Sequence, residues 1–147
     1  MKAIIQIVKD CQITVEDDIV ADMQNGLLIY LGIKHSDTSE DSRYLAEKIV
    51  NMRIFHDEMG KMNNSVIDLH KELCVVSQFT VYGDTSKGRR PSFNEAALAE
   101  QAETLYLNFI ECIKKYKLSV CTGSFGSHME VAYVNLGPVT FIVESKK

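Results

Sequence analysis

Residues 75–84 read Val-Val-Ser-Gln-Phe-Thr-Val-Tyr-Gly-Asp, an apolar run that becomes polar without a break. Together with the apolar residues just before it, the run predicts a buried strand over residues 73–81 and a turn at Gly83. Such a strand delivers hydroxyl and amide groups to its own end and holds them rigidly. We therefore expect a functional site at Ser77, Gln78 and Thr80.

A second informative stretch, residues 134–140, reads Val-Asn-Leu-Gly-Pro-Val-Thr. Its Gly137-Pro138 pair can become cis at small cost, because X–Pro bonds prefer trans by only about 0.5–1 kcal/mol. A cis Gly-Pro would form a sharp, rigid corner with two carbonyls directed outward. The alternative is an ordinary turn before the last strand.

The rest of the chain predicts an α+β fold, with mostly antiparallel sheet of roll or barrel-like form and two main helices packed on it. We expect one domain over residues 1–147. Asn25-Gly26 predicts a turn between two strands. Apolar or alternating segments predict further strands over residues 3–8, 12–15, 19–23, 27–33, 53–56, 118–121, 129–134 and 139–143. Residues 12–15 form either a second strand or the continuation of the first strand past a bend at Lys9-Asp10.

Both helices have a predicted start and a predicted buried face. The first begins near Thr38, which with Asp41 has the spacing of a capping box. The second begins at a capping box in Ser92-Phe93-Asn94-Glu95 and ends near Lys117. The buried residues should be Leu45, Ile49 and Met52 in the first, and Leu98, Ala102, Leu105, Phe109 and Ile113 in the second.

Charge and hydropathy limit the class of protein. No apolar run reaches the roughly 20 residues of a membrane span, and the N-terminus lacks a secretory pattern, so we expect a cytoplasmic protein. The net charge of −4 argues against a general nucleic-acid coat. Local basic patches remain open at Lys87-Gly88-Arg89-Arg90 and Lys114-Lys115-Tyr116-Lys117, with ordinary solvated surface as the alternative.

The cysteines and histidines show none of the spacings of zinc sites. We expect reduced, buried thiols, since no signal points to an oxidising compartment. A catalytic Cys-His pair is an alternative that no pattern favours. We therefore predict no metal and no cofactor.

The polar residues after the buried strand suggest work on a carbonyl group. Ser77 or Thr80 could act as a nucleophile, but no Asp-His relay is visible to activate either one. The other contribution is orientation, with an oxyanion hole from backbone N–H groups around Phe79 and Thr80. The structural alternative is that the hydroxyls simply satisfy backbone groups at a strand end.

Ser77-Gln78-Phe79-Thr80 and Asn135-Leu136-Gly137-Pro138-Val139-Thr140 together carry a family resemblance. They match the SQxx(L) and NxGPVT motifs of the D-aminoacyl-tRNA deacylases, chirality-proofreading hydrolases that the chain resembles over nearly its full length. Further matching stretches are Lys48-Ile49-Val50-Asn51, Arg53-Ile54-Phe55, Tyr82-Gly83-Asp84, Lys87-Gly88-Arg89-Arg90-Pro91-Ser92-Phe93, Thr122-Gly123 and Phe125-Gly126.

The resemblance implies a homodimer in which Gly137-Pro138, as a cis peptide, enters the pocket of the other subunit. Ser77, Gln78, Phe79 and Thr80 would form the floor of that pocket, with Phe125 and Met129 nearby. The two carbonyls would accept from the α-amino group of the substrate and leave no room for an L side chain. Glycine, which has no side chain, should then be a substrate too.

The implied reaction is hydrolysis of the ester between a D-amino acid and the 3′-terminal adenosine of tRNA, without metal or cofactor. Thr80 could attack directly, or the ribose 2′-hydroxyl could assist a water molecule; we favour the second route, because no base for Thr80 is evident. Lys87, Arg89 and Arg90 are candidates for contact with tRNA phosphates. The competing hypothesis is a nucleic-acid-binding dimer of the same fold with impaired catalysis.

Two positions depart from the family pattern. The family usually has arginine after the N-terminal glutamine, where this chain has Ile7, and aspartate within the second motif, where it has Leu136. The arginine is implied to help fix the Gly-Pro corner. His128 also stands where small or acidic residues are common, and we expect it to shape the pocket rim rather than act as a base.

Overall fold

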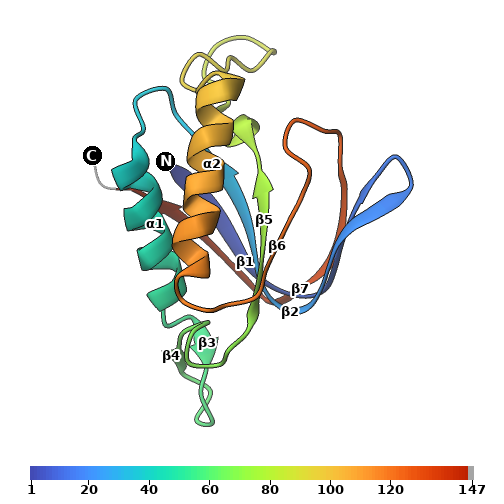
Figure 1. The fold of residues 1–147 in the computed structure, drawn as a ribbon, viewed down its shortest axis with the longest axis vertical. Coiled ribbons are helices and arrows are strands. Elements are labelled where there is room, and N and C mark those ends of the chain that lie inside the picture. The colour runs from blue at the N-terminus through green and yellow to red at the C-terminus, as the bar shows by residue number, and fades with distance from the viewer. Residues whose placement is uncertain (146–147) are drawn as a thin grey trace.

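The computed structural model describes residues 1–145 of the chain, which form one mixed five-stranded sheet with two helices on one of its faces (Figure 1). The strand order is β6-β5-β2-β1-β7. The longer strands are β1 (Lys2–Val15), β2 (Asp18–Gly32) and β7 (Glu130–Glu144), and the shorter ones are β5 (Glu72–Ser77) and β6 (Val120–Thr122). The helices are α1 (Ser39–Asn51) and α2 (Ala99–Lys114), and β3 (Phe55–His56) with β4 (Met62–Asn64) forms a small separate hairpin.

The pairing directions confirm the predicted α+β class and add a parallel part to it. The long strand β1, between β2 and β7 in the sheet, pairs antiparallel with both. The shorter pairings, β2 with β5 and β5 with β6, are parallel. Each parallel pair is connected through a helix, as crossover connections require. This places the carboxyl end of β5 beside the start of α2.

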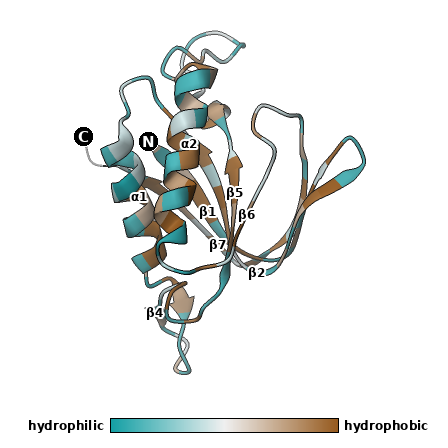
Figure 2. Ribbon diagram, viewed as in Figure 1, coloured by the Kyte–Doolittle hydropathy of each residue, from teal (hydrophilic) through white to brown (hydrophobic). Residues whose placement is uncertain are grey.

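Side chains alternate between two apolar clusters on opposite faces of the sheet. Leu27 and Leu73 belong to the larger cluster, which α1 and α2 cover, whereas the next residues, Leu28 and Cys74, belong to a smaller cluster on the other face. The inward faces of both helices are apolar (Figure 2). In α1 the predicted residues Leu45 and Ile49 are buried, and the Thr38 amide donates to the Asp41 carboxylate at 2.9 Å, as the capping box requires.

The predicted turn at Asn25-Gly26 is wrong, because β2 runs through both residues. Gly26 has a different role. A Cβ there would lie 1.9 Å from the backbone oxygen of Glu72 on β5, so only glycine lets the two strands approach so closely. Residues 3–8 and 12–15 belong to one strand, which is the second of the two alternatives, and the bend is at Asp10 with φ 51°.

The second helix starts later than predicted. Ser92 does not cap it but pairs with Asp84 across a loop, and α2 begins at Ala99 with no side-chain cap. Leu98, which the pattern placed on the buried face, is 83% exposed. A capping-box sequence satisfies backbone groups in a turn as well as in a helix, and here tertiary pairing selects the turn.

Candidate functional site

The end of β5 turns out of the sheet at the predicted polar residues. The strand ends at Ser77, earlier than predicted, and residues 79–82 form a single 3-10 turn, η1 (Phe79–Tyr82). The Gln78 amide still donates to Leu31 of β2 at 2.9 Å, which anchors the turn to the sheet. Just before the turn, the buried Tyr106 hydroxyl donates to the Val75 carbonyl at 2.8 Å, and burial raises the pKa of this phenol.

Two backbone amides at the turn have no acceptor within the described residues, those of Phe79 and Thr80. The first N–H groups of a helical turn lack partners inside it. They are therefore available to a negatively charged oxygen. The oxyanion hole expected at these amides stays a prediction.

A pocket of about 520 Å³ opens beside the turn. Its lining residues come from the end of β5, the start of α2, and the loop after β6 with the beginning of β7. Five of the predicted site residues line it, namely Ser77, Gln78, Phe79, Phe125 and Met129. His128 lines it too, on the exposed rim.

Thr80 does not line this pocket but borders it through Gln78. Its hydroxyl oxygen accepts a hydrogen bond from the Gln78 side-chain amide, and the residue is exposed. Within the described residues, no carboxylate or imidazole is hydrogen-bonded to Thr80. The geometry gives this hydroxyl an orienting partner and no general base.

Aromatic contacts fix two of the pocket walls. Phe79 is 55% exposed and packs edge-on against Phe93, with ring centroids 5.0 Å apart. Phe125 packs against Tyr106 at 5.6 Å. Behind this wall, a Cβ at Gly123 would lie 2.5 Å from the Met129 sulfur, so glycine lets Met129 pack closely against the loop.

The sequence analysis missed the small residues that leave the pocket open. Ala97, Ala99 and Ala102, around the start of α2, line the wall opposite Gln78. Alanine side chains indicate no particular chemistry. Of the three, the sequence analysis named only Ala102, as a residue of the buried face of the second helix. Their small size became informative only once the fold brought them to the pocket.

Gly137 and Pro138 lie outside the pocket of their own chain. They sit in a bulge of β7: Gln6 pairs with Thr140 and Val8 with Asn135, so residues 136–139 bulge out opposite Ile7 alone. The Gly137–Pro138 bond is cis, as the resemblance led us to expect, and both residues are exposed. The two motifs are therefore not brought together within one chain.

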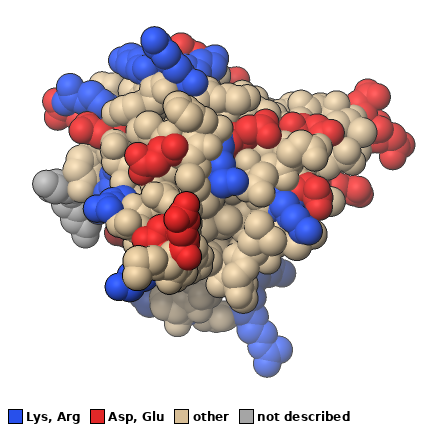
Figure 3. Space-filling model, turned by 90° about the horizontal axis from the view of Figure 1, so that it is seen from below, with Lys and Arg blue, Asp and Glu red and all other residues tan. Residues whose placement is uncertain are grey.

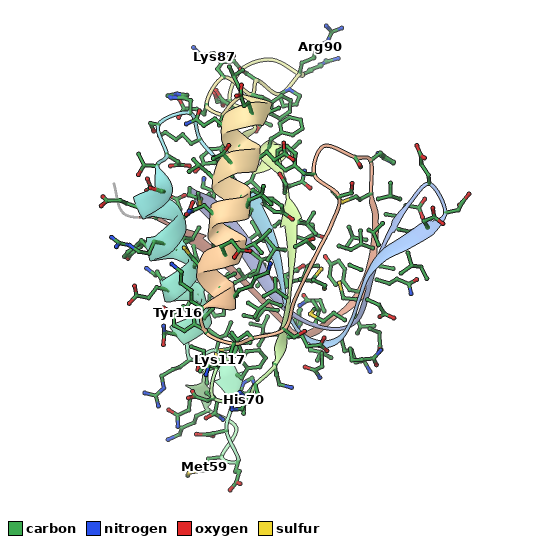
Figure 4. The ribbon with its side chains drawn as sticks, in the orientation of Figure 1. Met59, His70, Lys87, Arg90, Tyr116 and Lys117 are labelled. Carbon is green, nitrogen blue, oxygen red and sulfur yellow. The ribbon has the colours of Figure 1, made fainter. Side chains whose placement is uncertain are left out.

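The predicted basic residues lie at one end of the molecule. Lys87 and Arg90 extend outward at the top of the view, beyond the start of α2 (Figure 4). The second basic run lies at the other end of α2, where Lys114 pairs with Glu111 at 2.8 Å. Acidic side chains gather instead on the projecting β1–β2 hairpin, whose tip carries Glu16 (Figure 3).

The cysteines and other potential metal ligands of residues 1–145 are not grouped into a metal site. All four cysteines are free, and Cys11, Cys74 and Cys112 are buried. No group of three or more His, Cys, Asp or Glu side chains within residues 1–145 is arranged to hold a metal ion.

Comparisons with known proteins point in one direction. A family model described as D-Tyr-tRNA(Tyr) deacylase matches residues 4–144. The chain is 53% identical to the D-aminoacyl-tRNA deacylase of Thermosipho africanus and 50% identical to that of Alkaliphilus metalliredigens, each alignment covering 100% of this chain and 99% of the relative.

Two solved structures are similar to this chain over nearly its full length. One described as c-Myc DNA Unwinding Element Binding Protein superposes with a TM-score of 0.93 at 38% identity, covering 100% of both chains. Another, described as a probable eukaryotic D-amino acid tRNA deacylase, has a TM-score of 0.85 at 16% identity and covers 97% of this chain and 98% of its own. The second likeness shows the shared fold alone.

Proposed function

This chain belongs to the D-Tyr-tRNA(Tyr) deacylase family, and we propose that it hydrolyses the ester bond of D-aminoacyl-tRNA, and of glycyl-tRNA, to free amino acid and tRNA. Such a hydrolase proofreads chirality during translation. The observation that carries the proposal is the pocket lined by Ser77, Gln78 and Phe79 of the first motif, next to the backbone amides of Phe79 and Thr80, for which no acceptor is found within the described residues. The catalytic unit is one domain spanning residues 1–147, acting in the cytoplasm. No helix of residues 1–145 is long and apolar enough to span a membrane.

Incubation with D-Tyr-tRNA, L-Tyr-tRNA and Gly-tRNA tests the proposal. We expect D-tyrosine to be released from D-Tyr-tRNA and glycine from Gly-tRNA, while L-Tyr-tRNA stays intact. If no amino acid is released from any of the three substrates, the enzyme assignment is wrong, and the hypothesis of a nucleic-acid-binding dimer with impaired catalysis is favoured instead. The family match does not favour that hypothesis, although one relative is described as a DNA-element-binding protein. Release from the L form would sink chiral selection.

In the mechanism that we favour, the protein orients the ester and the substrate supplies the base. The amides of Phe79 and Thr80 stabilise the oxyanion that forms when water adds to the carbonyl carbon. The attacking water gives a proton to the ribose 2′-hydroxyl as its oxygen bonds to the carbonyl carbon. The bond between the carbonyl carbon and the ribose 3′-oxygen then breaks, and the 2′-hydroxyl passes a proton to that oxygen. Ser77 and Gln78 position the substrate, and the bond from Gln78 to Thr80 keeps the turn in one conformation.

Replacing Thr80 with alanine separates this mechanism from covalent catalysis. We expect Thr80→Ala to keep turnover of D-Tyr-tRNA within about tenfold of wild type, because a single neutral hydrogen bond contributes about 1 kcal/mol. A tRNA ending in 2′-deoxyadenosine should lose more activity than this variant does. Single-turnover rates provide the measurement. Complete loss in Thr80→Ala, with the deoxy substrate cleaved normally, would establish Thr80 as the nucleophile.

Chiral selection requires a second subunit in this proposal. Gly137 and Pro138 are exposed and lie outside their own pocket, which supports a homodimer in which they enter the pocket of the partner. The sheet face away from the helices leaves Ile142 68% exposed on the edge strand β7. An apolar side chain on an unpaired edge strand is a suitable contact for a second copy of the chain.

Contact with tRNA phosphates is assigned to Lys87, Arg89 and Arg90, on the exposed loop between Asp84 and Ser92. We expect the double variant Arg89→Ala/Arg90→Ala to raise KM and leave kcat nearly unchanged. The slope of log KM against log salt should fall by about one for each arginine lost. Lys61→Ala, an exposed lysine near the β3–β4 hairpin, is the matched control. An unchanged salt slope in the double variant would remove these residues from the tRNA interface.

A further inference from the structure

A hydrogen-bond network closes the neck of the Gly137–Pro138 bulge. The side-chain amide of Gln6, on β1, donates to Thr140 Oγ1 at 3.0 Å and to Asn135 Oδ1 at 3.3 Å. Its carbonyl oxygen accepts from the Tyr133 hydroxyl at 2.8 Å. Gln6 therefore contacts β7 on both sides of the bulge, because Asn135 precedes it and Thr140 follows it.

Asn135 completes the closure from within β7. Its side-chain amide donates to the carbonyl of Val139 at 3.1 Å and to that of Ile7 at 3.0 Å. Both N–H groups of Gln6 and of Asn135 are used, and each side-chain oxygen accepts a bond, so both amide orientations are determined.

The position of this network indicates what it does. The backbone ladder between β1 and β7 is interrupted over residues 136–139, so side chains hold the strands together there. On the helix side, Leu136 and Val139 pack against the larger apolar cluster, which contains Ile7. The two ends of the bulge are thus fixed from both faces of the sheet, while Gly137 and Pro138 stay exposed between them.

We propose that Gln6 and Tyr133 are positioning residues for chiral selection: they fix where the carbonyls at Gly137 and Pro138 lie against the substrate. This inference rests on the proposed function. The clash that excludes an L side chain depends on the bulge keeping its position, because misplacement by about 1 Å can change a rate about 100-fold. A purely structural network would affect stability and leave the ratio of L to D hydrolysis unchanged.

Two conservative variants remove single hydroxyl groups from the network. We expect Tyr133→Phe and Thr140→Val each to raise hydrolysis of L-Tyr-tRNA, relative to D-Tyr-tRNA, by about fivefold, the effect of one neutral hydrogen bond of about 1 kcal/mol on an equilibrium. Gly-tRNA should be hydrolysed within about twofold of the wild-type rate, because glycine has no side chain to clash. Thr140→Ser keeps the hydroxyl and should restore selection. Tyr116→Phe, at the far end of α2, is the matched tyrosine control.

The amide resonance of Gly137 in a nuclear magnetic resonance spectrum gives a readout that needs no activity. We expect it to shift or broaden in Tyr133→Phe and Thr140→Val and to match wild type in Thr140→Ser and Tyr116→Phe. If the wild-type protein hydrolyses no substrate, the proposed function fails and this resonance alone decides whether the network positions the bulge. An unchanged Gly137 resonance, or an unchanged L-to-D ratio in an active protein, overturns the inference.

Discussion

Replacing Gly137 with alanine is expected to abolish chiral selection and to lower the hydrolysis of D-Tyr-tRNA by about 100-fold or more, the effect of a misplacement of about 1 Å. Gly137 has φ +108°, which an L residue adopts only with strain. An added Cβ would also lie 2.7 Å from Val139 Cγ2 and 3.0 Å from the Val139 nitrogen. Because Asn135 holds the Val139 carbonyl, the bulge itself must shift. Rates with D-Tyr-tRNA and L-Tyr-tRNA measure both effects.

Gly60→Ala is the matched control for this variant. Gly60 has φ +74° but no atom within 4 Å of an added Cβ, and it lies in the β3–β4 hairpin. Gly60→Ala should keep wild-type activity and chiral selection, because it introduces the same kind of backbone strain as Gly137→Ala but no steric contact. Normal selection in Gly137→Ala would contradict the role assigned to the Gly-Pro corner.

Subunit mixing then tests whether that corner acts across a dimer interface. Gly137→Ala supplies an intact pocket, and Gln78→Ala supplies an intact Gly-Pro. Each variant alone should hydrolyse D-Tyr-tRNA slowly. After random exchange of subunits mixed in equal amounts, half of the dimers contain one subunit of each variant and therefore one complete site. About a quarter of all sites should then be active. No recovery after demonstrated exchange would place the corner and the pocket in the same chain.

Replacing Gly26 with alanine is expected to lower the free energy of unfolding by about 4 kcal/mol, among the larger effects of single substitutions. The added Cβ would lie 1.9 Å from the Glu72 oxygen and 2.7 Å from its carbonyl carbon. These are backbone atoms on the neighbouring strand, so no side-chain rotation relieves the contact. Part of the parallel pairing between β2 and β5 must separate, and that pairing carries the strand that leads to Ser77.

Urea unfolding at a fixed protomer concentration measures this loss, since the stability of a dimer depends on concentration. Gly88→Ala is the control: Gly88 has φ +70° in an exposed loop, and an added Cβ would meet nothing within 4 Å. We expect it to change stability by no more than about 1 kcal/mol. A similarly small change in Gly26→Ala would show that β2 can move away from β5 at little cost.

The departures at Ile7 and Leu136 are accommodated by packing. Ile7 is 6% exposed within the larger apolar cluster, and Leu136 packs against the same cluster. The polar bonds to the bulge come instead from their neighbours Gln6 and Asn135, on the other side of the strands. The cis Gly137–Pro138 bond is present in a chain that lacks the arginine of the family pattern.

The sequence by itself determined the features that depend on regular periodicity and on motif residues. The i, i+4 spacing of Leu45 and Ile49 predicts one apolar face of α1, and both residues are buried. This spacing is independent of which element the helix packs against. The segment at the end of the apolar run identified Ser77, Gln78 and Phe79, which line the pocket, and the family resemblance added Phe125, Met129 and the reaction. In these cases the signal lies within one segment of the chain.

Where a local sequence pattern is compatible with two conformations, only the tertiary structure decided which one forms. Asn25-Gly26 is an ordinary turn signal, yet the close approach of Glu72 from a distant strand requires that glycine inside a strand. Ser92 has the pattern of a helix cap, but its pairing with Asp84 fixes a loop instead. The pocket depends on such choices, because the later start of α2 brings Ala97 and Ala99 to face the end of β5, and the bulge in β7 holds Gly137 away from its own pocket. Contacts between segments distant in the sequence set these outcomes, and no single segment contains them.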